Sequence, residues 1–291
     1  MSVAESYYAE VLDSRGELLM GATQAGYLHG PMVEWVPGPS EKTYTERNSA
    51  EGVALHSIVG EEKEFHDGIP DRFLNMARLP DGRFTPYAAA SCQHILRKFD
   101  THFTGYATMI QMYAFTQATW TSGGREANTK FLSVEIEGGG YLNGLPNYSE
   151  PLNDLQIRTL LLFLIVAERW MQRRRNDPKF RLVYGENVLQ HKHIAQKYGY
   201  AATACASDRP VRAMLMLPQY REDLAMEDAV ARQDAAAAKA QADTLNDVLV
   251  IQRDLQRAIN QPHPVAWRIH ALLMGAGYLV DPEFKKENPW K

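Results

Sequence analysis

The feature that most constrains the fold of this chain is a long stretch without glycine or proline near its C-terminal end. The segment from Arg221 to Gln261 contains neither residue and is rich in alanine, which has the highest helix propensity. At 3.6 residues per turn, it predicts one helix of about ten turns. Gln252 and several acidic residues interrupt its apolar seam, so any coiled coil would be weak. The apolar heptad positions are Leu224, Ala231, Ala238, Leu245 and Ile259.

The sequence after this segment predicts a second, shorter helix. Pro-His-Pro at residues 262–264 predicts a break, and a helix is expected around Trp267–Gly275. Residues 218–291 are therefore expected to form a helical C-terminal extension. Its long helix, residues 218–260, is expected to pack on the preceding domain or to self-associate.

Strand-like patterns recur before residue 218. Gly52–Gly60 is a short apolar run between glycines, which predicts a buried strand. Phe131–Glu137 alternates with a period of two residues and ends in a glycine turn. Pro-Asp-Gly at residues 80–82 indicates a hairpin.

The longest apolar helix is predicted for residues 153–175, where Asn153 or Asp154 is suited to cap the start. Arginines near its end suit the helix dipole. Because strands and helices are mixed along residues 46–217, we expect an α/β domain there. Residues 1–45 predict short strands and turns.

Composition narrows the classes of protein that this chain can represent. Its 291 residues are 45% hydrophobic and 23% charged, with a net charge of −4, which gives no reason to expect nucleic-acid binding. The longest apolar run, Leu160–Ala167, is too short to span a bilayer. The first residues lack a basic region before an apolar core, so no secretory signal is expected. With only two cysteines, Cys92 and Cys205 are expected to be free thiols or ligands.

A polar stretch in residues 184–212 places Cys205 shortly after two histidines, His191 and His193. Imidazole and thiolate both suit zinc, and a catalytic zinc site uses three protein ligands with one open position. One of these histidines and Cys205 would supply two ligands. His56, late in an apolar strand, is the best third candidate. The alternative is that each of these histidines is a core residue whose ring forms a hydrogen bond with a backbone carbonyl.

The order of several segments resembles the zinc amidases of the peptidoglycan-recognition and phage-lysozyme family. The resemblance covers about residues 33–212, and its most specific part is His-Lys followed by Ala-Gln-Lys-Tyr-Gly and Thr-Ala-Cys. The matching segments are ALHSIVG, RLPDGRFTPYAAASCQHI, NTKFLSVEIEGGG, LNDLQIRTLLLFLIVAERW and LQHKHIAQKYGYAATACASDR. The resemblance implies an α/β domain over residues 33–217, with a mixed central β-sheet flanked by helices. Residues 1–32 then form an N-terminal strand and loop segment.

The resemblance also implies an activity and a metal site. Members cleave the amide bond between the N-acetylmuramic lactyl group and L-alanine. The implied ligands of Zn²⁺ are His56, His191 and Cys205. His193 then stands at the motif's acidic position and is expected to lie outside the ligand set.

Four further residues receive roles from the resemblance. Glu135 matches the glutamate that faces the site, and Thr203 stands where members carry lysine or threonine, so both are assigned to catalysis. His94 and Asn128 are assigned to substrate binding. Glu135 has an alternative interpretation, in which it is an exposed strand residue that pairs with Lys130 or Arg125.

Some positions depart from the family pattern. Leu74 and Asn75 stand where active members often carry an aromatic residue and a histidine, Gln190 replaces a glycine, and Ala206 replaces a proline. The main hypothesis is a zinc-dependent peptidoglycan amidase, either a phage lysin or a tail-associated hydrolase. The alternative is an inactive or weak phage structural protein that binds the cell wall.

The remaining expectations concern partners and location. Peptidoglycan is the expected partner, without nucleic acid or a membrane span. Self-association or binding to a phage particle through the C-terminal helix stays open, as does a regulatory role of that helix. The expected location is the host cytoplasm until lysis, or the virion. Residues 100–127 are interpreted either as a sugar-stacking wall of the groove or as a covered insertion.

Overall fold

The computed structural model describes residues 9–12, 17–58, 65–66, 69–86, 88–138, 141–142, 145–146, 150–206 and 208–259. It divides into two units, residues 1–229 and 230–291. Among the helices of the described residues, none combines the length and apolar character needed to cross a membrane.

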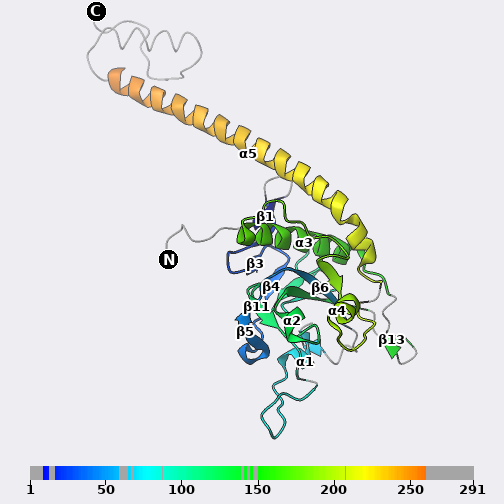
Figure 1. The fold of residues 1–291 in the computed structure, drawn as a ribbon. Helices are drawn as coiled ribbons and strands as arrows, with labels where there is room; N and C mark the ends of the chain where they lie inside the picture. Colours follow the sequence, from blue (N-terminus) through cyan, green and yellow to red (C-terminus); the bar gives the residue numbers. More distant parts are fainter. Residues whose placement is uncertain are drawn as a thin grey trace, which may run out of the picture. The chain divides into compact units, whose positions relative to one another are not determined.

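The first unit is built around a six-stranded mixed sheet (Figure 1). β6, β12 and β9 are neighbours in parallel, and β15 joins β6 in parallel at one end. β10 runs antiparallel to β9 and parallel to β4. The sheet order is β15 (Val188–Gln190), β6 (Gly52–Ile58), β12 (Phe131–Glu137), β9 (His94–Leu96), β10 (Met109–Gln111) and β4 (Val33–Trp35). The expected mixed central sheet is confirmed.

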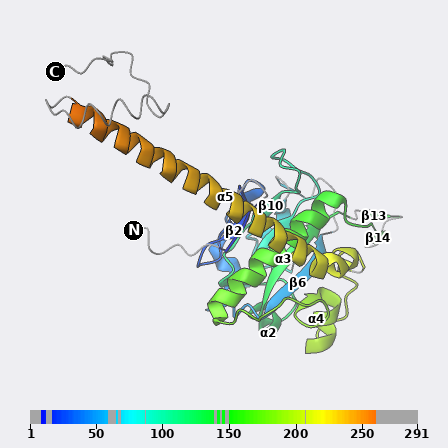
Figure 2. The same cartoon turned by 90° about the horizontal axis from the view of Figure 1, so that it is seen from above.

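Helix α3 (Asp154–Arg175) covers one face of this sheet (Figure 2). It begins at a capping box, in which the Asn153 side chain accepts from the Gln156 amide and the Gln156 side chain accepts from the Asn153 amide. This arrangement satisfies two backbone donors that the first turn leaves unpaired. Between its ends, α3 is almost continuously buried, so it supplies most of the helical side of the core. The predicted helix is confirmed, with Asn153 as its cap.

The opposite face of the sheet is covered by smaller elements. Helices α2 (Arg125–Asn128) and α4 (His191–Tyr198) contact β12, β6 and β15. Alternation along a strand sends successive side chains to opposite faces. Accordingly, Val53 and Leu55 pack in the core cluster that includes α3, whereas Ala54 packs in the cluster with α2 and α4 residues.

Several short elements surround the sheet. The predicted hairpin at residues 80–82 is present as a turn, with Gly82 at φ +83° and a bridge between Arg78 and Phe84. The other elements are β1 (Ala9–Leu12), β2 (Leu18–Ala22), β3 (Leu28–His29), η1 (Ser40–Lys42), β5 (Thr43–Arg47), β7 (Phe65–His66), β8 (Ile69–Pro70), α1 (Asp71–Leu74), β11 (Gln117–Thr119), β13 (Tyr141–Leu142) and β14 (Leu145–Pro146).

The predicted long C-terminal helix is present as α5 (Val211–Ile259). Within the first unit, Leu224 and Asp228 on α5 are buried, and Asp228 forms an ion pair with Arg169 at 2.5 Å. The structure divides between residues 229 and 230, whereas the sequence placed a domain boundary between 217 and 218. The predicted helix around Trp267–Gly275 lies outside the described residues.

Candidate metal centre and adjoining cavity

The parallel register of β6 and β12 places His56 next to Glu135. Both residues lie on the sheet face away from α3, because their strand neighbours Leu55 and Val134 pack in the core cluster that includes α3. Glu135 Oε1 is 4.0 Å from His56 Nδ1. Both side chains are almost fully buried, so their interaction is sheltered from water.

His191 comes to the same place because it begins α4 directly after β15, which pairs in parallel with β6. Cys205 lies in a loop that is held against both elements. The Lys192 amide donates to the Cys205 carbonyl at 2.9 Å, and the Ser57 amide donates to Cys205 Sγ at 3.1 Å. The thiol sulfur is thus oriented by the backbone of β6.

Arg209 fastens the loop after Cys205 to the sheet. Its side chain is buried, and Nη1 donates to Ser57 Oγ at 2.7 Å. Nη2 donates to the Glu137 carbonyl at 3.1 Å, and Nε donates to the Glu150 carbonyl at 2.7 Å. A single guanidinium therefore joins the ends of β6 and β12 to the segment that carries Cys205.

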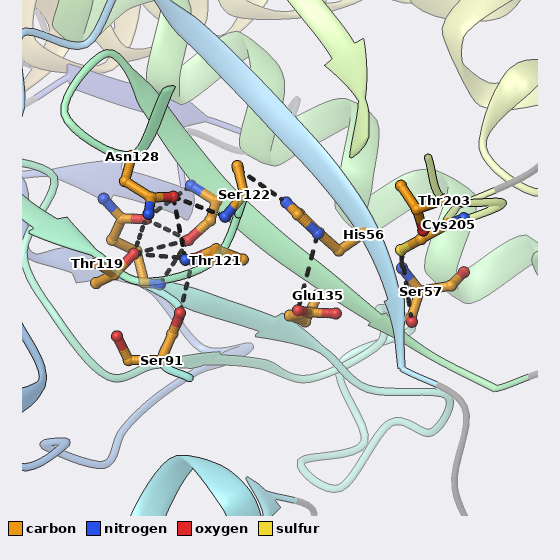
Figure 3. A network of polar contacts seen from close by, with 12 residues as sticks. His56, Ser57, Ser91, Thr119, Thr121, Ser122, Asn128, Glu135, Thr203 and Cys205 are labelled. Atoms are coloured by element: carbon orange, nitrogen blue, oxygen red, sulfur yellow. Dashed lines mark hydrogen bonds and ion pairs between the residues drawn. The ribbon is translucent and has the colours of Figure 1, made fainter. Parts of the chain in front are cut away.

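The potential ligand atoms of His56, His191 and Cys205 all lie within 4.8 Å of one another. The centroids of the two imidazole rings are 4.6 Å apart. Figure 3 shows His56 and Cys205 on either side of the strand that carries Ser57, with Glu135 close to the imidazole. The structure thus brings together the three residues that the sequence predicted as ligands, from three separate elements.

The protonation chemistry of these groups fits a metal cation. Burial lowers the pKa of His56 well below its ordinary value, with His191 adding a smaller electrostatic effect. Burial likewise lowers the pKa of His191, so both rings are expected to be neutral donors. Burial and the nearby Glu135 carboxylate raise the pKa of Cys205 to about 12. A thiolate at this position therefore needs a cation, and two imidazoles with one thiolate are a donor set suited to zinc.

His193 and Thr203 lie beside this cluster in different ways. His193 is partly exposed on α4, and its ring centroid is 6.3 Å from that of Tyr184. It does not belong to the cluster of potential metal ligands. Thr203 Oγ1 accepts a hydrogen bond from the Cys205 amide at 3.2 Å, so its visible contact is with the Cys205 loop.

Glu135 is buried, and its environment raises its proton affinity. Its side-chain atom Oε2 is buried without a hydrogen-bond partner, and burial raises the pKa of Glu135 to about 7, against an opposing effect of Arg72. The alternative partners are engaged elsewhere: Lys130 pairs with Glu126 at 2.8 Å, and Arg125 pairs with Glu46. The interpretation of Glu135 as an exposed residue paired with Lys130 or Arg125 is wrong.

A cavity and a wider groove adjoin the cluster. The cavity has a volume of about 210 Å³ and is lined by His56, Glu135, His191 and Cys205, together with Arg72, Phe73, Trp120 and others. The groove has a volume of about 760 Å³ and shares Ala90, Trp120, Thr121 and His191 with the cavity. Its other lining residues include Tyr44, Arg78, Arg83, Phe84 and Asn128. An extended molecule in the groove can therefore reach this cluster.

Asn128 lies in the wall of the groove, but its polar atoms are used within the protein. Asn128 Oδ1 accepts from the amides of Thr121 at 3.1 Å and Ser122 at 2.6 Å, and Nδ2 donates to Tyr44 Oη at 3.2 Å. Ser122 Oγ in turn lies 3.3 Å from His56 Nε2. Asn128 thus holds the loop that contacts the His56 imidazole, and Figure 3 shows this chain of contacts.

The structure does not bring His94 to the groove. Directly before β9, the Gln93 side chain accepts from Ser133 Oγ. Ile95 on β9 packs in the same cluster as Phe73, which lines the cavity, so His94 between them points to the opposite side. It is fully buried, and its ring lies 5.0 Å from Phe115 and 4.8 Å from Phe163, measured between centroids. The expectation that His94 binds substrate is not met, because strand alternation places it in the α3 core.

Arg72, Ser122 and Lys42 contact the site but were not predicted from the sequence. Arg72 lines the cavity, and the buried Lys42 ammonium donates to the Arg72 carbonyl at 2.7 Å. No spacing pattern marks these residues, because they reach the site through turns and short elements. Residues 100–127 contribute in two ways: Met109–Gln111 form a buried strand of the sheet, whereas Trp120 lines both cavity and groove.

Comparison with known proteins gives matches among solved structures only. No protein-family model matches the chain, and no curated protein matches it significantly. An endolysin, the N-acetylmuramoyl-L-alanine amidase LysCS from Clostridium intestinale, matches with a TM-score of 0.38 and 13% identity over 64% of this chain and 94% of that one. The Staphylococcus aureus hydrolase AmiA matches with 0.34 and 11% over 59% and 70%. The PlyG catalytic domain matches with 0.34 and 13% over 68% and 94%.

LysCS is named as an N-acetylmuramoyl-L-alanine amidase, the activity of the family that the sequence motifs resemble. At these scores and identities, the likeness does not carry the activity of those proteins over to this chain.

Proposed function

We propose that this chain is a zinc-dependent peptidoglycan hydrolase that cleaves the amide bond between the N-acetylmuramic lactyl group and L-alanine. The observation that carries the proposal is the convergence of His56, His191 and Cys205 within 4.8 Å. A buried carboxylate, Glu135, lies beside them, and a groove opens onto them. We further propose a phage lysin or a tail-associated hydrolase as its biological setting, on the basis of the sequence resemblance.

The proposed roles follow from the chemistry of these groups. Zinc held by His56, His191 and Cys205 would supply a Lewis acid and lower the pKa of a water molecule toward ~7. Glu135, whose pKa is raised to about 7 by burial, is suited both to accept a proton and to return it near neutral pH.

In the proposed reaction, Glu135 carries one proton from the attacking water to the leaving nitrogen. The water oxygen bonds to the amide carbon while one water proton moves to Glu135. The carbon–nitrogen bond then breaks, and Glu135 delivers that proton to the leaving nitrogen of L-alanine. The products are the lactyl carboxylic acid and a free amine, which exchange their remaining proton through solvent.

The groove is proposed to hold the glycan and the start of the stem peptide. Tyr44, Phe84 and Trp120 line it, and aromatic faces are suited to pack against sugar rings. Asn128 is proposed to act on substrate indirectly, through the loop at Thr121 and Ser122. Thr203 is proposed to affect catalysis through Cys205, because Thr203 Oγ1 accepts a hydrogen bond from the Cys205 amide.

Hydrolysis of purified sacculi tests the proposal. The full chain with zinc should release dye-labelled wall fragments and generate new amino termini of L-alanine, and a chelator should abolish both signals. A Glu135→Gln variant keeps the size of the side chain but loses its basicity. It should keep its zinc and lower the rate by about 10²–10⁴-fold.

Two results would contradict this proposal. Wild-type protein that yields no new amino termini on walls from several bacterial types would reject amidase activity. If the Glu135→Gln variant cleaves as fast as the wild type, Glu135 carries no proton in the reaction.

A second function is favoured by one specific observation. Leu74, at the position of an aromatic helper in the resembled family, has no hydroxyl or other polar atom, which favours a wall-binding protein without turnover. Such a protein would pellet with sacculi and release no amino termini. The two functions are therefore separated by turnover, not by zinc content.

A further inference from the structure

Arg72 is a cationic side chain in the cavity that the proposed mechanism leaves unused. It lines the cavity together with His56, Glu135, His191 and Cys205. Its positive charge lowers the pKa values of His56, Glu135 and Cys205, in each case as a smaller effect than burial. The guanidinium is thus close enough for its field to reach both the metal ligands and the proton carrier.

The position of Arg72 is fixed from several sides. Its guanidinium carbon lies 5.1 Å from the centroid of the Phe73 ring, and Phe73 is itself buried in a core cluster. The Arg72 carbonyl accepts from Lys42 Nζ at 2.7 Å. The same ammonium is 3.4 Å from the carbonyl of Ala90, another residue that lines the cavity. Such anchoring gives a pre-organised donor.

One donor of this side chain has no acceptor within the protein. Arg72 Nε is buried and forms no hydrogen bond. Leaving a buried donor unpaired is costly, so an unpaired donor on a side chain that lines a cavity indicates that a ligand there supplies acceptors for this side chain. In this cavity, the ligand group nearest to Glu135 and the metal ligands would be the scissile amide itself.

We propose that Arg72 is a catalytic residue, whose guanidinium donates hydrogen bonds to the scissile carbonyl oxygen as negative charge develops on it. This inference rests on the proposed amidase function. When the water oxygen bonds to the carbonyl carbon, an electron pair of the C=O bond moves onto the oxygen, and the Arg72 donors stabilise that charge. When the carbon–nitrogen bond breaks, the pair returns to re-form the carbonyl.

This role predicts a particular kinetic signature. The charge on the oxygen is present in the transition state and not in the bound substrate, so Arg72 should affect kcat and not KM. Removing one pre-organised oxyanion donor typically costs about 10²–10³-fold in kcat. If Arg72 instead bound a carboxylate of the substrate, its removal would raise KM.

The test uses the zinc-loaded full chain, a soluble muropeptide and three Arg72 variants. Arg72→Gln removes the charge, Arg72→Lys keeps the charge without the planar fork, and Arg72→Ala leaves space for added guanidinium ion. Arg158→Gln is the matched control, because Arg158 is exposed on α3, which covers the opposite face of the sheet. Zinc content and melting temperature verify that each variant is folded and loaded. If Arg72→Gln does not fold, Arg72→Lys and the guanidinium response of Arg72→Ala decide the test.

The expected result is a kcat lower by about 10²–10³-fold in Arg72→Gln with KM changed by less than about threefold. Arg72→Lys should fall between that variant and the wild type, and millimolar guanidinium should speed Arg72→Ala but not the wild type. Titration calorimetry of zinc-free protein should give equal muropeptide affinity for wild type and Arg72→Gln.

Three results would overturn the inference. A raised KM or weakened affinity with unchanged kcat would make Arg72 a substrate-binding residue only. Full activity of Arg72→Gln would leave Arg72 without a role while the amidase function stands. A wild type inactive on every wall tested would reject the proposed function, and this inference with it.

Discussion

The three predicted metal ligands have potential ligand atoms that all lie within 4.8 Å of one another. His56 is 2% exposed, and burial raises the pKa of Cys205 to about 12. Single alanine substitutions of His56, His191 and Cys205 should each lower bound zinc from one ion per chain to a small fraction, because two protein ligands are fewer than the three of a catalytic zinc site. Elemental analysis of purified protein gives the zinc content.

His193 is the matched control for this experiment, since it lies two residues from His191 on the same helix and outside the ligand cluster. A His193→Ala variant should keep its zinc. Zinc loss in that variant, with retention in His191→Ala, would show that the wrong histidine was chosen.

His94 makes a separate prediction about stability and pH. Burial lowers its pKa to about 3 from an ordinary value of 6.5. The unfolded chain therefore binds more protons than the folded chain between these values, so this residue lowers stability as the pH falls from 6.5 toward 3. A His94→Phe variant should lose this part of the pH dependence, which amounts to at most about 5 kcal/mol.

Denaturant unfolding at pH 7 and pH 4.5 measures the effect. His102→Phe provides the control, because it makes the same replacement at a histidine that is exposed. The same slope in His94→Phe and wild type would show that His94 does not titrate in this way.

At the level of residues, the sequence predicted the cluster of His56, His191 and Cys205 better than it predicted the groove. His191 and Cys205 were recognisable because their spacing follows from one local unit, a helix start and the loop that returns to it. His94 was misplaced because its strand has three residues, too few for a period-two pattern to show which face it occupies. Arg72 carried no pattern, because its position depends on Lys42, which is 30 residues away in the chain.

At the level of elements, η1 and α1 are joined by Lys42, a buried lysine whose ammonium donates to the carbonyl of Arg72. Burial lowers the pKa of Lys42 to about 8 from 10.5. Between these values the unfolded chain binds more protons, so this residue makes the folded state more stable as the pH rises from 8 to 10.5. Lys42→Met should remove that dependence.

The same substitution should separate stability from activity. At pH 7 it removes a desolvated charge, so the melting temperature should change little or rise. Hydrolysis should fall by about tenfold or more, because the Arg72 segment loses its tether. Lys239→Met, on an exposed part of α5, should change neither. A large loss of stability at pH 7 with full activity would contradict this account.

The longer elements were predictable for physical reasons that the structure makes visible. α3 has a capping box at Asn153 and a long apolar run, and β6 has glycine at its start. β9 and β10 were not predicted, because they are three-residue strands whose residues become strand only through pairing with β12 and β4. Tertiary contacts, which local propensity does not contain, therefore decide this part of the sheet.

At the level of the whole molecule, the division between the two units falls inside a continuous helix. The sequence predicted a boundary at residue 217 because the long alanine-rich stretch without glycine or proline begins shortly after it. The structure keeps Pro218 within α5, and the following turns supply partners to α3. Composition does not mark a division at residue 229, because the helix has the same character on both sides of it.

Two truncated chains test where the first unit ends. Glu168, which is 3% exposed, accepts from Arg221 at 2.8 Å, and Asp228 pairs with Arg169. A chain that ends at Ala229 keeps these partners and should fold with one zinc and the melting temperature of the full chain.

A chain that ends at Leu217 leaves Glu168 without Arg221 and uncovers the core that Leu224 fills. Removing one partner of a buried pair costs about 3–5 kcal/mol, so this chain should melt much lower or fail to fold. Equal melting temperatures and zinc contents for both chains would instead place the boundary at residue 217, where the sequence predicted it.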